Sequence, residues 1–495
     1  MSGSRSAWPG PWLVLGLVLA LTAARLLVNG WLDPLPLSGD EAQYWLYGEH
    51  WAGGYYSKPP LLPWLIRLST EVFGDAPWAV RLPSVVLHLL IALCLFAIAR
   101  TLFDRATAWL AALLYLTLPA ISVSSMIAST DPPMLFGWAL ATLALVRART
   151  VPEANLHWWA LLGFGLGTGL LGKYTMIAWL PAAALLLAFD PHWRRAVSWR
   201  GVGLAVIAAL VAVSPNLVWN ARNGFPTLLH LGENADLGQT ARSLEERAAE
   251  LGEFLLAQAG VFGPIAFVIV VLLLVRPAIW RDPRFRLLLG LGLPLLLAIS
   301  AQAWLNRANA NWAAPVYLGF AVAVAAWLVQ TGRARLARWT IGLNLVAFVA
   351  IVLAAGLNAR EPTPWSRLWD PFRLLRGMDA IGDQVGPLLY AEPDRHLLMT
   401  ERMPLANVLQ RTGWPLERSV AWNPSGRVTN HFELVTSMPD DPDARFLLVL
   451  TRGDPAPILA RFREHELALR ATIPTHADRG RELVVYRLAG FRGYR

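Results

Sequence analysis

Lysine, cysteine and charged residues are all scarce in this chain of 495 residues. Charged residues make up 16% of it, against about a quarter in soluble globular domains. The single cysteine, Cys94, excludes an internal disulfide and a metal site built on several cysteines. Among the 43 basic residues only Lys58 and Lys173 are lysines. Because lysine is a compact point charge and arginine a wide planar fork, two retained lysines indicate sites for an anion such as phosphate. Chance survival under a coding bias is the alternative.

Apolar residues form 55% of the chain and gather in runs of about 17–22 residues, the length of helix that spans a bilayer. About eleven such runs begin near Trp12, Leu82, Ala108, Pro133, Trp158, Tyr174, Val202, Gln258, Leu287, Ala313 and Ile341. We therefore expect a polytopic α-helical membrane protein with about eleven transmembrane helices. The first run lacks a cleavage site followed by a soluble domain, so we interpret it as a retained helix rather than a signal peptide.

The net charge of +9 could suggest a nucleic-acid partner, but the arginines are distributed in a way that favours a membrane. They cluster in alternate loops, at residues 100–105, 147–149, 194–200, 276–286 and 333–338. The positive-inside rule makes that face cytoplasmic. We expect the N-terminus in the cytoplasm, the C-terminus outside it, the lipid bilayer as partner, and no nucleic acid. The absence of disulfides and the preference for arginine favour a bacterial inner membrane.

The opposite face carries the polar material. A large outer loop, residues 29–80, belongs to a predicted transmembrane catalytic domain over residues 1–357. Residues 358–495 are polar and proline-rich, with strand-like runs at 446–450 and 483–486 and a predicted helix at 457–470. This pattern predicts a small extracytoplasmic α/β domain.

Two acidic residues, Asp40 and Glu41, open the first outer loop. Ser38 followed by Glu41 reads as a capping box, so a helix should start here. The two carboxylates would then lie in its first turn, where they would complement the helix dipole. Alternatively, Asp40 acts as a general base toward an acceptor hydroxyl.

Each lysine lies in a distinctive local sequence. Lys58 follows Tyr55 and Tyr56 and precedes two prolines, which favour extended backbone. A lysine at headgroup depth could meet a lipid phosphate or simply snorkel to the surface. Lys173 interrupts a long apolar stretch, which makes it a functional candidate, although it could also mark a tight turn between two spans.

Three further outer-face groups are weaker candidates. Asp131 starts an Asp-Pro-Pro sequence at the mouth of a span, where it could act as an ordinary helix cap. His230 and Glu233 could hold a metal or a sugar, but an isolated histidine is more often structural. A polar cluster of the kind that holds sugar hydroxyls comprises Arg307, Asn309, Asn311 and Trp312.

The order of these motifs resembles a known family. It comprises Asp40-Glu41, then Tyr55-x-x-Lys58-Pro-Pro, Asp131-Pro and Gly172-Lys173-Tyr174. It is similar to the membrane glycosyltransferases of the GT-C fold, in the branch that contains protein O-mannosyltransferases and the aminoarabinose transferases of lipid A. The similarity covers residues 31–312. It implies an integral enzyme that moves a sugar from a polyprenyl phosphate to a membrane lipid, glycan or protein acceptor on the outer face.

The resemblance also implies roles for individual residues. Asp40 matches the family's essential loop aspartate, with Glu41 beside it and Tyr44 on the same helix. The second acidic position matches Asp131. The residues that match the family's phosphate-binding positions are Tyr55, Lys58 and Lys173. With two lysines to neutralise the leaving phosphate, a cofactor is not required, although the carboxylates leave room for a divalent metal.

This chain departs from the aminoarabinose transferases at two positions, which bears on the expected donor sugar. Gln43 stands where those enzymes have arginine, and Ser57 where they have glutamate, so aminoarabinose is a doubtful donor sugar. The main alternative function is a transporter or flippase of lipid-linked sugars, which would need charged or broken segments near the membrane midplane. A further alternative, an O-antigen ligase or polymerase, would not be expected to carry this loop.

Overall fold

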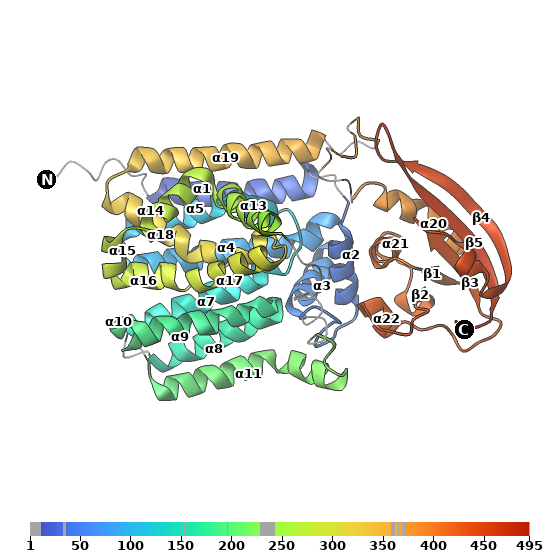
Figure 1. Cartoon of the computed structure of the whole chain (residues 1–495), viewed down its shortest axis with the longest axis horizontal. Helices are drawn as coiled ribbons and strands as arrows, with labels where there is room; N and C mark the ends of the chain where they lie inside the picture. Colours follow the sequence, from blue (N-terminus) through green and yellow to red (C-terminus); the bar gives the residue numbers. More distant parts are fainter. Residues whose placement is uncertain are drawn as a thin grey trace.

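The computed structural model describes most of the chain. The described residues are 11–32, 36–151, 155–195, 197–227, 243–357, 362–364, 366–368, 370, 373 and 375–494. A bundle of long helices occupies one end of the molecule and a β-sheet occupies the other. Two short helices, α2 (Gly39–Glu49) and α3 (Leu61–Phe73), lie between them (Figure 1). Helix α1 begins at the end of the bundle that is remote from the sheet (Figure 1).

The longer helices form the bundle. They are α1 (Pro11–Leu27), α4 (Pro77–Leu102), α5 (Arg105–Thr117), α7 (Asp131–Thr150), α8 (Asn155–Gly172), α9 (Trp179–Phe189), α11 (Trp199–Arg222), α13 (Leu244–Phe262), α14 (Pro264–Leu274), α16 (Pro283–Gly290), α17 (Leu293–Leu305), α18 (Val316–Gln330) and α19 (Ala334–Leu357). Short helical pieces join them: η2 (Val28–Leu32), α6 (Pro119–Ser124), η4 (Tyr174–Ala178), α10 (Pro191–Arg194), α15 (Pro277–Arg281) and η5 (Ala310–Ala313).

Among the described residues, five helices are long and apolar enough to cross a membrane, or six if the bent pair α13 and α14 is one span. Every expected span starts at or within a helix, but several of these helices are short or broken. The membrane-protein class is therefore confirmed, while the number of eleven crossings stays a prediction.

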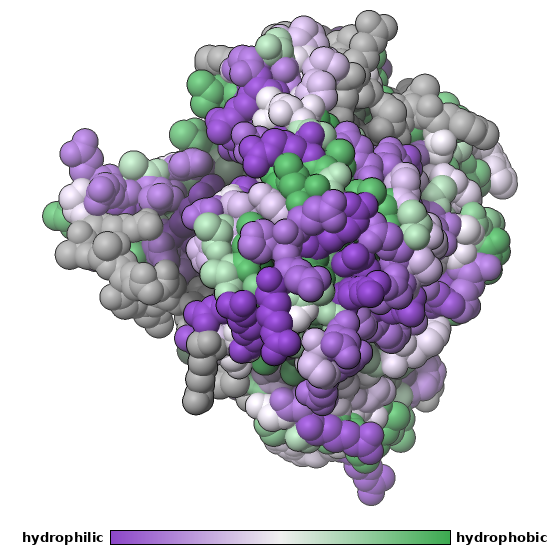
Figure 2. All heavy atoms as spheres, turned by 90° about the vertical axis from the view of Figure 1, so that its right-hand side faces the viewer, coloured by the Kyte–Doolittle hydropathy of each residue, from purple (hydrophilic) through white to green (hydrophobic). Residues whose placement is uncertain are grey.

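Two outer helices of the bundle expose apolar side chains. In α11 and in α19, only 22% of the most apolar stretch of the helix is buried inside the protein. Val211 and Val346 are among the residues exposed there. By contrast, the end of the molecule that carries the sheet has a mainly hydrophilic surface (Figure 2). This division is expected of a bundle that faces lipid and a domain that faces water.

The sheet has five strands in the order β2-β1-β3-β5-β4. They are β1 (His396–Met399), β2 (Ser419–Ala421), β3 (Arg445–Leu450), β4 (Phe462–Pro474) and β5 (Gly480–Phe491). β1 is parallel to β2 and β3, whereas β5 is antiparallel to β3 and β4. Four helices accompany the sheet: α20 (Met378–Ala391), α21 (Arg402–Thr412), α22 (His431–Val435) and α23 (Ala456–Leu459). The two predicted strands are confirmed as β3 and part of β5.

The predicted helix at 457–470 is wrong. Only Ala456–Leu459 is helical, and Phe462–Pro474 forms the edge strand β4. The segment 457–470 contains glutamate, leucine, alanine and arginine, which are good helix formers, and this local preference is the reason why a helix was predicted. A long antiparallel ladder with β5 overrides that local preference. Mostly exposed charged side chains on β4 suit an edge strand.

One face of the sheet and the first outer loop share a single hydrophobic core. Side chains alternate along a strand, so Leu447 and Val449 of β3 point to one face and Leu448 to the other. The first face packs with α20, α21 and residues of α2 (Gly39–Glu49) and α3 (Leu61–Phe73). The C-terminal residues are therefore joined to the outer loop by buried apolar surface.

Candidate active site

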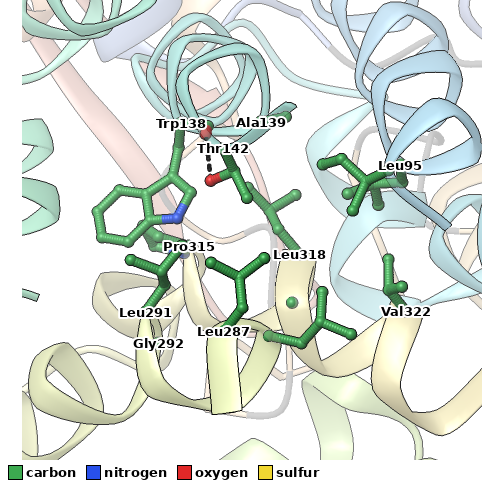
Figure 3. Close-up of a pocket in the computed structure, with 13 residues that line it drawn as sticks. Leu95, Trp138, Ala139, Thr142, Leu287, Leu291, Gly292, Pro315, Leu318 and Val322 are labelled. Atoms are coloured by element: carbon green, nitrogen blue, oxygen red, sulfur yellow. Dashed lines mark hydrogen bonds between the residues drawn. The ribbon is translucent and has the colours of Figure 1, made fainter. Parts of the chain in front are cut away.

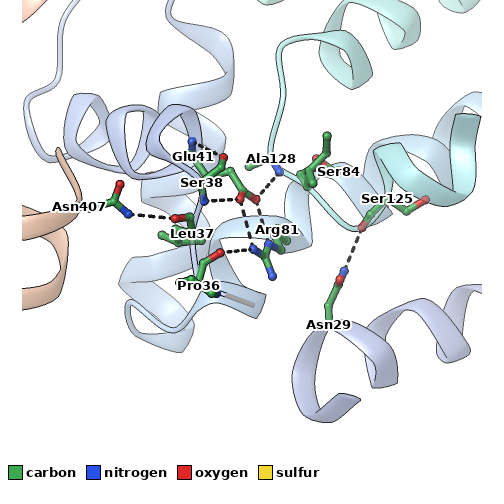
Figure 4. A network of polar contacts seen from close by, with 11 residues as sticks. Asn29, Pro36, Leu37, Ser38, Glu41, Arg81, Ser84, Ser125, Ala128 and Asn407 are labelled. Atoms are coloured by element: carbon green, nitrogen blue, oxygen red, sulfur yellow. Dashed lines mark hydrogen bonds and ion pairs between the residues drawn. The ribbon is translucent and has the colours of Figure 1, made fainter. Parts of the chain in front are cut away.

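Helix α2 begins with the capping box that the sequence predicts. Ser38 is the N-cap, its hydroxyl accepts from the Glu41 N–H at 3.2 Å, and Glu41 accepts from the Ser38 N–H at 2.9 Å. Glu41 is also paired with Arg81, whose Nε lies 2.9 Å from Oε1, and it accepts from the Ala128 N–H at 2.9 Å (Figure 4). One carboxylate thus ties together α2, α4 and the segment before α7.

The environment of Glu41 favours a structural role. Both side chains of the Glu41–Arg81 pair are 2% exposed. Burial alone would raise the pKa of Glu41, but Arg81 and the N–H groups of Ser38 and Ala128 lower it below its ordinary value. The carboxylate stays ionised and fully engaged in the protein. The prediction that Glu41 takes part in catalysis therefore has no geometric support, whereas Asp40, the preceding residue, is exposed.

A tight turn holds Lys58. Tyr55 and Lys58 exchange both backbone hydrogen bonds, at 3.0 and 3.1 Å. Two glycines before the turn lie against α11, since a Cβ at Gly54 would come within 2.6 Å of Nδ2 of Asn216. That amide donates to the Gly53 carbonyl at 2.9 Å, and its oxygen accepts from the Tyr174 hydroxyl at 2.9 Å. Asn216 thus links the loop of Lys58 to the residue that follows Lys173.

The ammonium of Lys58 lacks a hydrogen-bonded or ionic partner among the described residues. It lies 6.0 Å from the centroid of the Tyr44 ring, at cation–π distance. Burial lowers the pKa of Lys58, Asp40 and Asp131 act to raise it, and Lys173 and Arg402 add to the lowering. Each of these four groups therefore lies within electrostatic reach of Lys58. Lys58 is a half-buried cation with no compensating ion pair, as an anion site requires.

Lys173 and Asp131 form the second half of the cluster. The Lys173 ammonium lies 2.7 Å from Oδ1 of Asp131, and the Asn311 amide donates to Oδ2 at 2.8 Å. Asp131 is the first residue of α7 and does not cap it, which argues against the ordinary helix-start interpretation. A Cβ at Gly172 would lie 2.6 Å from the backbone nitrogen of Met134, so glycine permits the close approach of α8 to α7.

Three predicted tyrosines are held inside the protein. The hydroxyl of Tyr55 donates to the Tyr47 and His50 carbonyls at 2.6 and 3.0 Å, and its ring stacks on Tyr47 with centroids 4.4 Å apart. The hydroxyl of Tyr56 donates to the Val428 carbonyl at 3.1 Å. Such positions suit a framework role rather than the predicted phosphate or substrate contact. Tyr44, also buried, borders the cluster through Lys58.

The remaining predicted residues have three different outcomes. Asn311 joins the cluster through Asp131, as described above. Arg307 is exposed, and no described contact connects it to the cluster, so its role stays a prediction. His230 and Glu233 lie outside the described residues.

Carboxylates such as those of this region are the oxygen ligands that divalent metals use in proteins. In the part of the chain that the structure describes, no three His, Cys, Asp or Glu side chains come together in a way that could hold a metal ion. Asp131 is occupied by Lys173 and Asn311, and Glu41 by Arg81. The described donors therefore do not assemble a metal centre.

A small pocket inside the bundle is of a different kind. It lies between α4, α7, α16 and α18 and is lined by apolar side chains such as Leu95, Trp138 and Leu318 (Figure 3). Its hydroxyl group, on Thr142, donates back to the Trp138 carbonyl at 2.8 Å. The lining of this pocket offers no charged group to a phosphate.

Sequence reasoning missed three residues of this region. Arg81 stands at the predicted outer end of a span, where the positive-inside rule does not place arginine, and this was a usable signal. Asn216 interrupts an apolar run and could have been noticed for the same reason. Arg402 belongs to the C-terminal residues, and only the fold brings it to α2.

Comparison with known proteins identifies relatives of this chain. Residues 57–219 match the family described as dolichyl-phosphate-mannose-protein mannosyltransferase. A lipid A galacturonosyltransferase from Rhizobium johnstonii is 34% identical over 344 residues, which is 68% of this chain and 70% of that protein. An undecaprenyl phosphate-α-4-amino-4-deoxy-L-arabinose arabinosyl transferase from Pseudomonas aeruginosa is 34% identical over 200 residues, 39% of this chain and 34% of that protein.

Solved structures show the same fold. The crystal structure of apo ArnT from Cupriavidus metallidurans superposes with a TM-score of 0.66 at 16% identity, covering 95% of this chain and 97% of that one. The same protein bound to undecaprenyl phosphate gives a TM-score of 0.65, also at 16% identity, and covers 96% and 98% of the two chains.

Fold and sequence together define the class: this is a membrane enzyme with the GT-C fold, a glycosyltransferase. The chain belongs to the family that includes the lipid A galacturonosyltransferase of Rhizobium johnstonii. The resemblance inferred from the motifs is confirmed. The transporter alternative finds no support, since these relatives are named as transferases.

Proposed function

We propose that this chain transfers a hexuronosyl group, such as galacturonosyl, from a polyprenyl phosphate to lipid A. The observation that carries the proposal is the half-buried, uncompensated ammonium of Lys58, within electrostatic reach of Asp40 and of the Asp131–Lys173 pair. The names of the relatives support the substrate classes. One transfers galacturonosyl groups to lipid A, another uses undecaprenyl phosphate as sugar carrier, and ArnT has been crystallised with undecaprenyl phosphate.

The proposed reaction is a direct displacement at the anomeric carbon. The bond between that carbon and the acceptor oxygen forms as the bond to the phosphate oxygen breaks, and the electron pair leaves on polyprenyl phosphate. Lys58 and Lys173 stabilise the negative charge that develops on the leaving phosphate. Attack from the opposite side inverts the anomeric configuration.

Asp40 is the proposed general base. It is exposed at the first turn of α2, and the described residues offer it no ion pair or hydrogen bond that would compete with an acceptor hydroxyl. It takes the proton of that hydroxyl as the new bond forms and later releases it to water. Asp131 and Asn311 position Lys173, and Tyr44 provides an aromatic wall beside Lys58.

We further propose that catalysis occurs on the periplasmic face of a bacterial inner membrane. The short helices α10 and α15, which carry arginines, lie at the end of the bundle opposite α2, α3 and the sheet (Figure 1). This supports a cytoplasmic N-terminus, and a periplasmic position for residues 358–495 beyond a transmembrane domain of residues 1–357.

A divalent metal is not needed in the proposed mechanism, because two lysines neutralise the leaving group. Turnover should be unchanged after incubation with EDTA and after addition of Mg²⁺ or Mn²⁺. A loss with EDTA that Mn²⁺ reverses would contradict this part of the proposal.

The function is tested with full-length protein purified in detergent, a set of polyprenyl-phosphate sugars, and lipid A. Mass spectrometry follows both free polyprenyl phosphate and glycosylated lipid A. We expect acceptor-dependent release with a hexuronosyl donor and no release by Asp40→Asn. Donor binding without release across the whole set would contradict a transferase.

A further inference from the structure

The C-terminal residues reach the active site through helix α21. The Asn407 amide of α21 donates to the Leu37 carbonyl at 2.9 Å, just before α2. A Cβ at Gly39 would lie 2.7 Å from Cβ of Met403, so α21 packs directly on the residue that precedes Asp40. The first turn of α21 is therefore fixed beside the proposed base.

Arg402, the first residue of α21, brings a positive charge to this place. Its side chain is exposed and, among the described residues, makes no ion pair or hydrogen bond. The adjacent acid, Glu401, is engaged elsewhere, by the Arg452 guanidinium and the Thr451 hydroxyl. Arg402 lies within electrostatic reach of Tyr44 and Lys58. It is thus a free cation at the rim of the cluster.

The charged groups around this arginine are partly matched with one another. Asp131 is paired with Lys173, and Asp40 lies within electrostatic reach of Lys58. Arg402 has no ion pair among the described residues. A planar guanidinium in this position is suited to a sugar carboxylate, which it binds through two parallel hydrogen bonds.

We propose that Arg402 is a specificity residue that binds the carboxylate of the transferred sugar and so selects hexuronosyl donors over neutral ones. This inference rests on the proposed function and adds a residue that recognises the donor. It also gives the C-terminal domain a part in donor choice. Alternatively, Arg402 could bind a phosphate group of the acceptor, which would make it an acceptor-binding residue. The test below distinguishes these two roles.

The test compares two donors that differ only at carbon 6, a galacturonosyl and a galactosyl polyprenyl phosphate. For the hexuronosyl donor we expect Arg402→Gln to lower kcat/KM about 10- to 100-fold, mainly through KM, because a charge-assisted bidentate contact is lost. The neutral donor should be unaffected. Arg402→Lys should restore only part of the preference. Arg411→Gln, at the other end of α21 in an exposed pair with Asp383, is the matched control and should leave both donors unaffected.

Different results overturn different claims. Equal losses with both donors, or no loss with either, would contradict a role in sugar recognition. A loss that disappears when the lipid A acceptor is dephosphorylated would assign Arg402 to the acceptor and also overturn the inference. If the unmodified protein turns over no hexuronosyl donor, the proposed function itself fails, which is seen before any variant is made.

Discussion

Two ion pairs of the candidate active-site region have opposite surroundings. In the Glu41–Arg81 pair both side chains are 2% exposed, and each oxygen of Glu41 accepts hydrogen bonds from the protein. In the Asp131–Lys173 pair the side chains are 11% and 25% exposed, and the uncompensated Lys58 lies within reach. The first pair is closed to a ligand and the second is open to one.

The difference distinguishes an ion pair that holds helices together from one that can take part in the proposed reaction. Asp40 and Glu41 are neighbours in the sequence, yet one is exposed and the other buried in a complete network. A buried ion pair that lacks one partner leaves an uncompensated charge, so the closed pair should govern stability. The open pair should govern turnover.

The largest effect on stability is expected from Glu41→Gln. This variant leaves Arg81 buried without its counter-charge, which should cost about 3–5 kcal/mol in the free energy of unfolding. Thermal unfolding in detergent measures it. The control is Glu49→Gln, which removes a more exposed partner of Arg67 and should cost no more than about 1 kcal/mol. Equal unfolding temperatures for the two variants would show that the Glu41 network is not structural.

After loss of the proposed base, the next largest effect on turnover at unchanged stability is expected from Asp131→Asn. The neutral amide no longer holds the Lys173 ammonium, so transfer should fall about 100-fold or more, and the unfolding temperature should remain close to that of the unmodified protein. Asp282→Asn breaks a pair with Arg284 elsewhere in the bundle and is the matched control. Lys173→Arg keeps the charge but changes its shape. Normal transfer by Lys173→Arg would remove the case for a required lysine.

A smaller effect should follow from Gly172→Ala. Its methyl group would meet the backbone of Met134, so α8 and α7 must move apart and Lys173 shifts from Asp131. We expect transfer to fall about 10-fold, since misplacing a charge by about 1 Å is costly. Gly203→Ala on α11, where a Cβ meets nothing within 4 Å, tests whether any added methyl has this effect. Similar rates for both variants would argue against the close approach.

The smallest effect concerns pH. Because burial lowers the pKa of Lys58, its ammonium should lose its proton at a lower pH than an ordinary lysine. Only the protonated form attracts the phosphate, so KM for the donor should rise with pH, beginning at a lower pH than the titration of an ordinary lysine would produce. In Lys58→Arg the charge persists, and the rise should be absent. An identical pH dependence of KM in both proteins would contradict phosphate binding by Lys58.

Local signals in the sequence predicted the capping box at Ser38, the apolar helices, two strands and four charged members of the site, Asp40, Lys58, Asp131 and Lys173. These features depend on neighbours in the chain, or on residue types that are conspicuous in an apolar context. The Glu41–Arg81 pair and the Arg402 position depend on contacts between distant segments. Strand β4 was mistaken for a helix for the same reason, since its partner β5 decides its structure.

We propose that Asp40, and not the adjacent Glu41, carries the chemistry. Single-turnover release of polyprenyl phosphate is measured for Asp40→Asn and for Glu41→Gln, at a temperature where both remain folded. We expect Asp40→Asn to bind the donor but to release no polyprenyl phosphate, whereas folded Glu41→Gln should retain substantial release. Full release by Asp40→Asn would show that Asp40 is not the base.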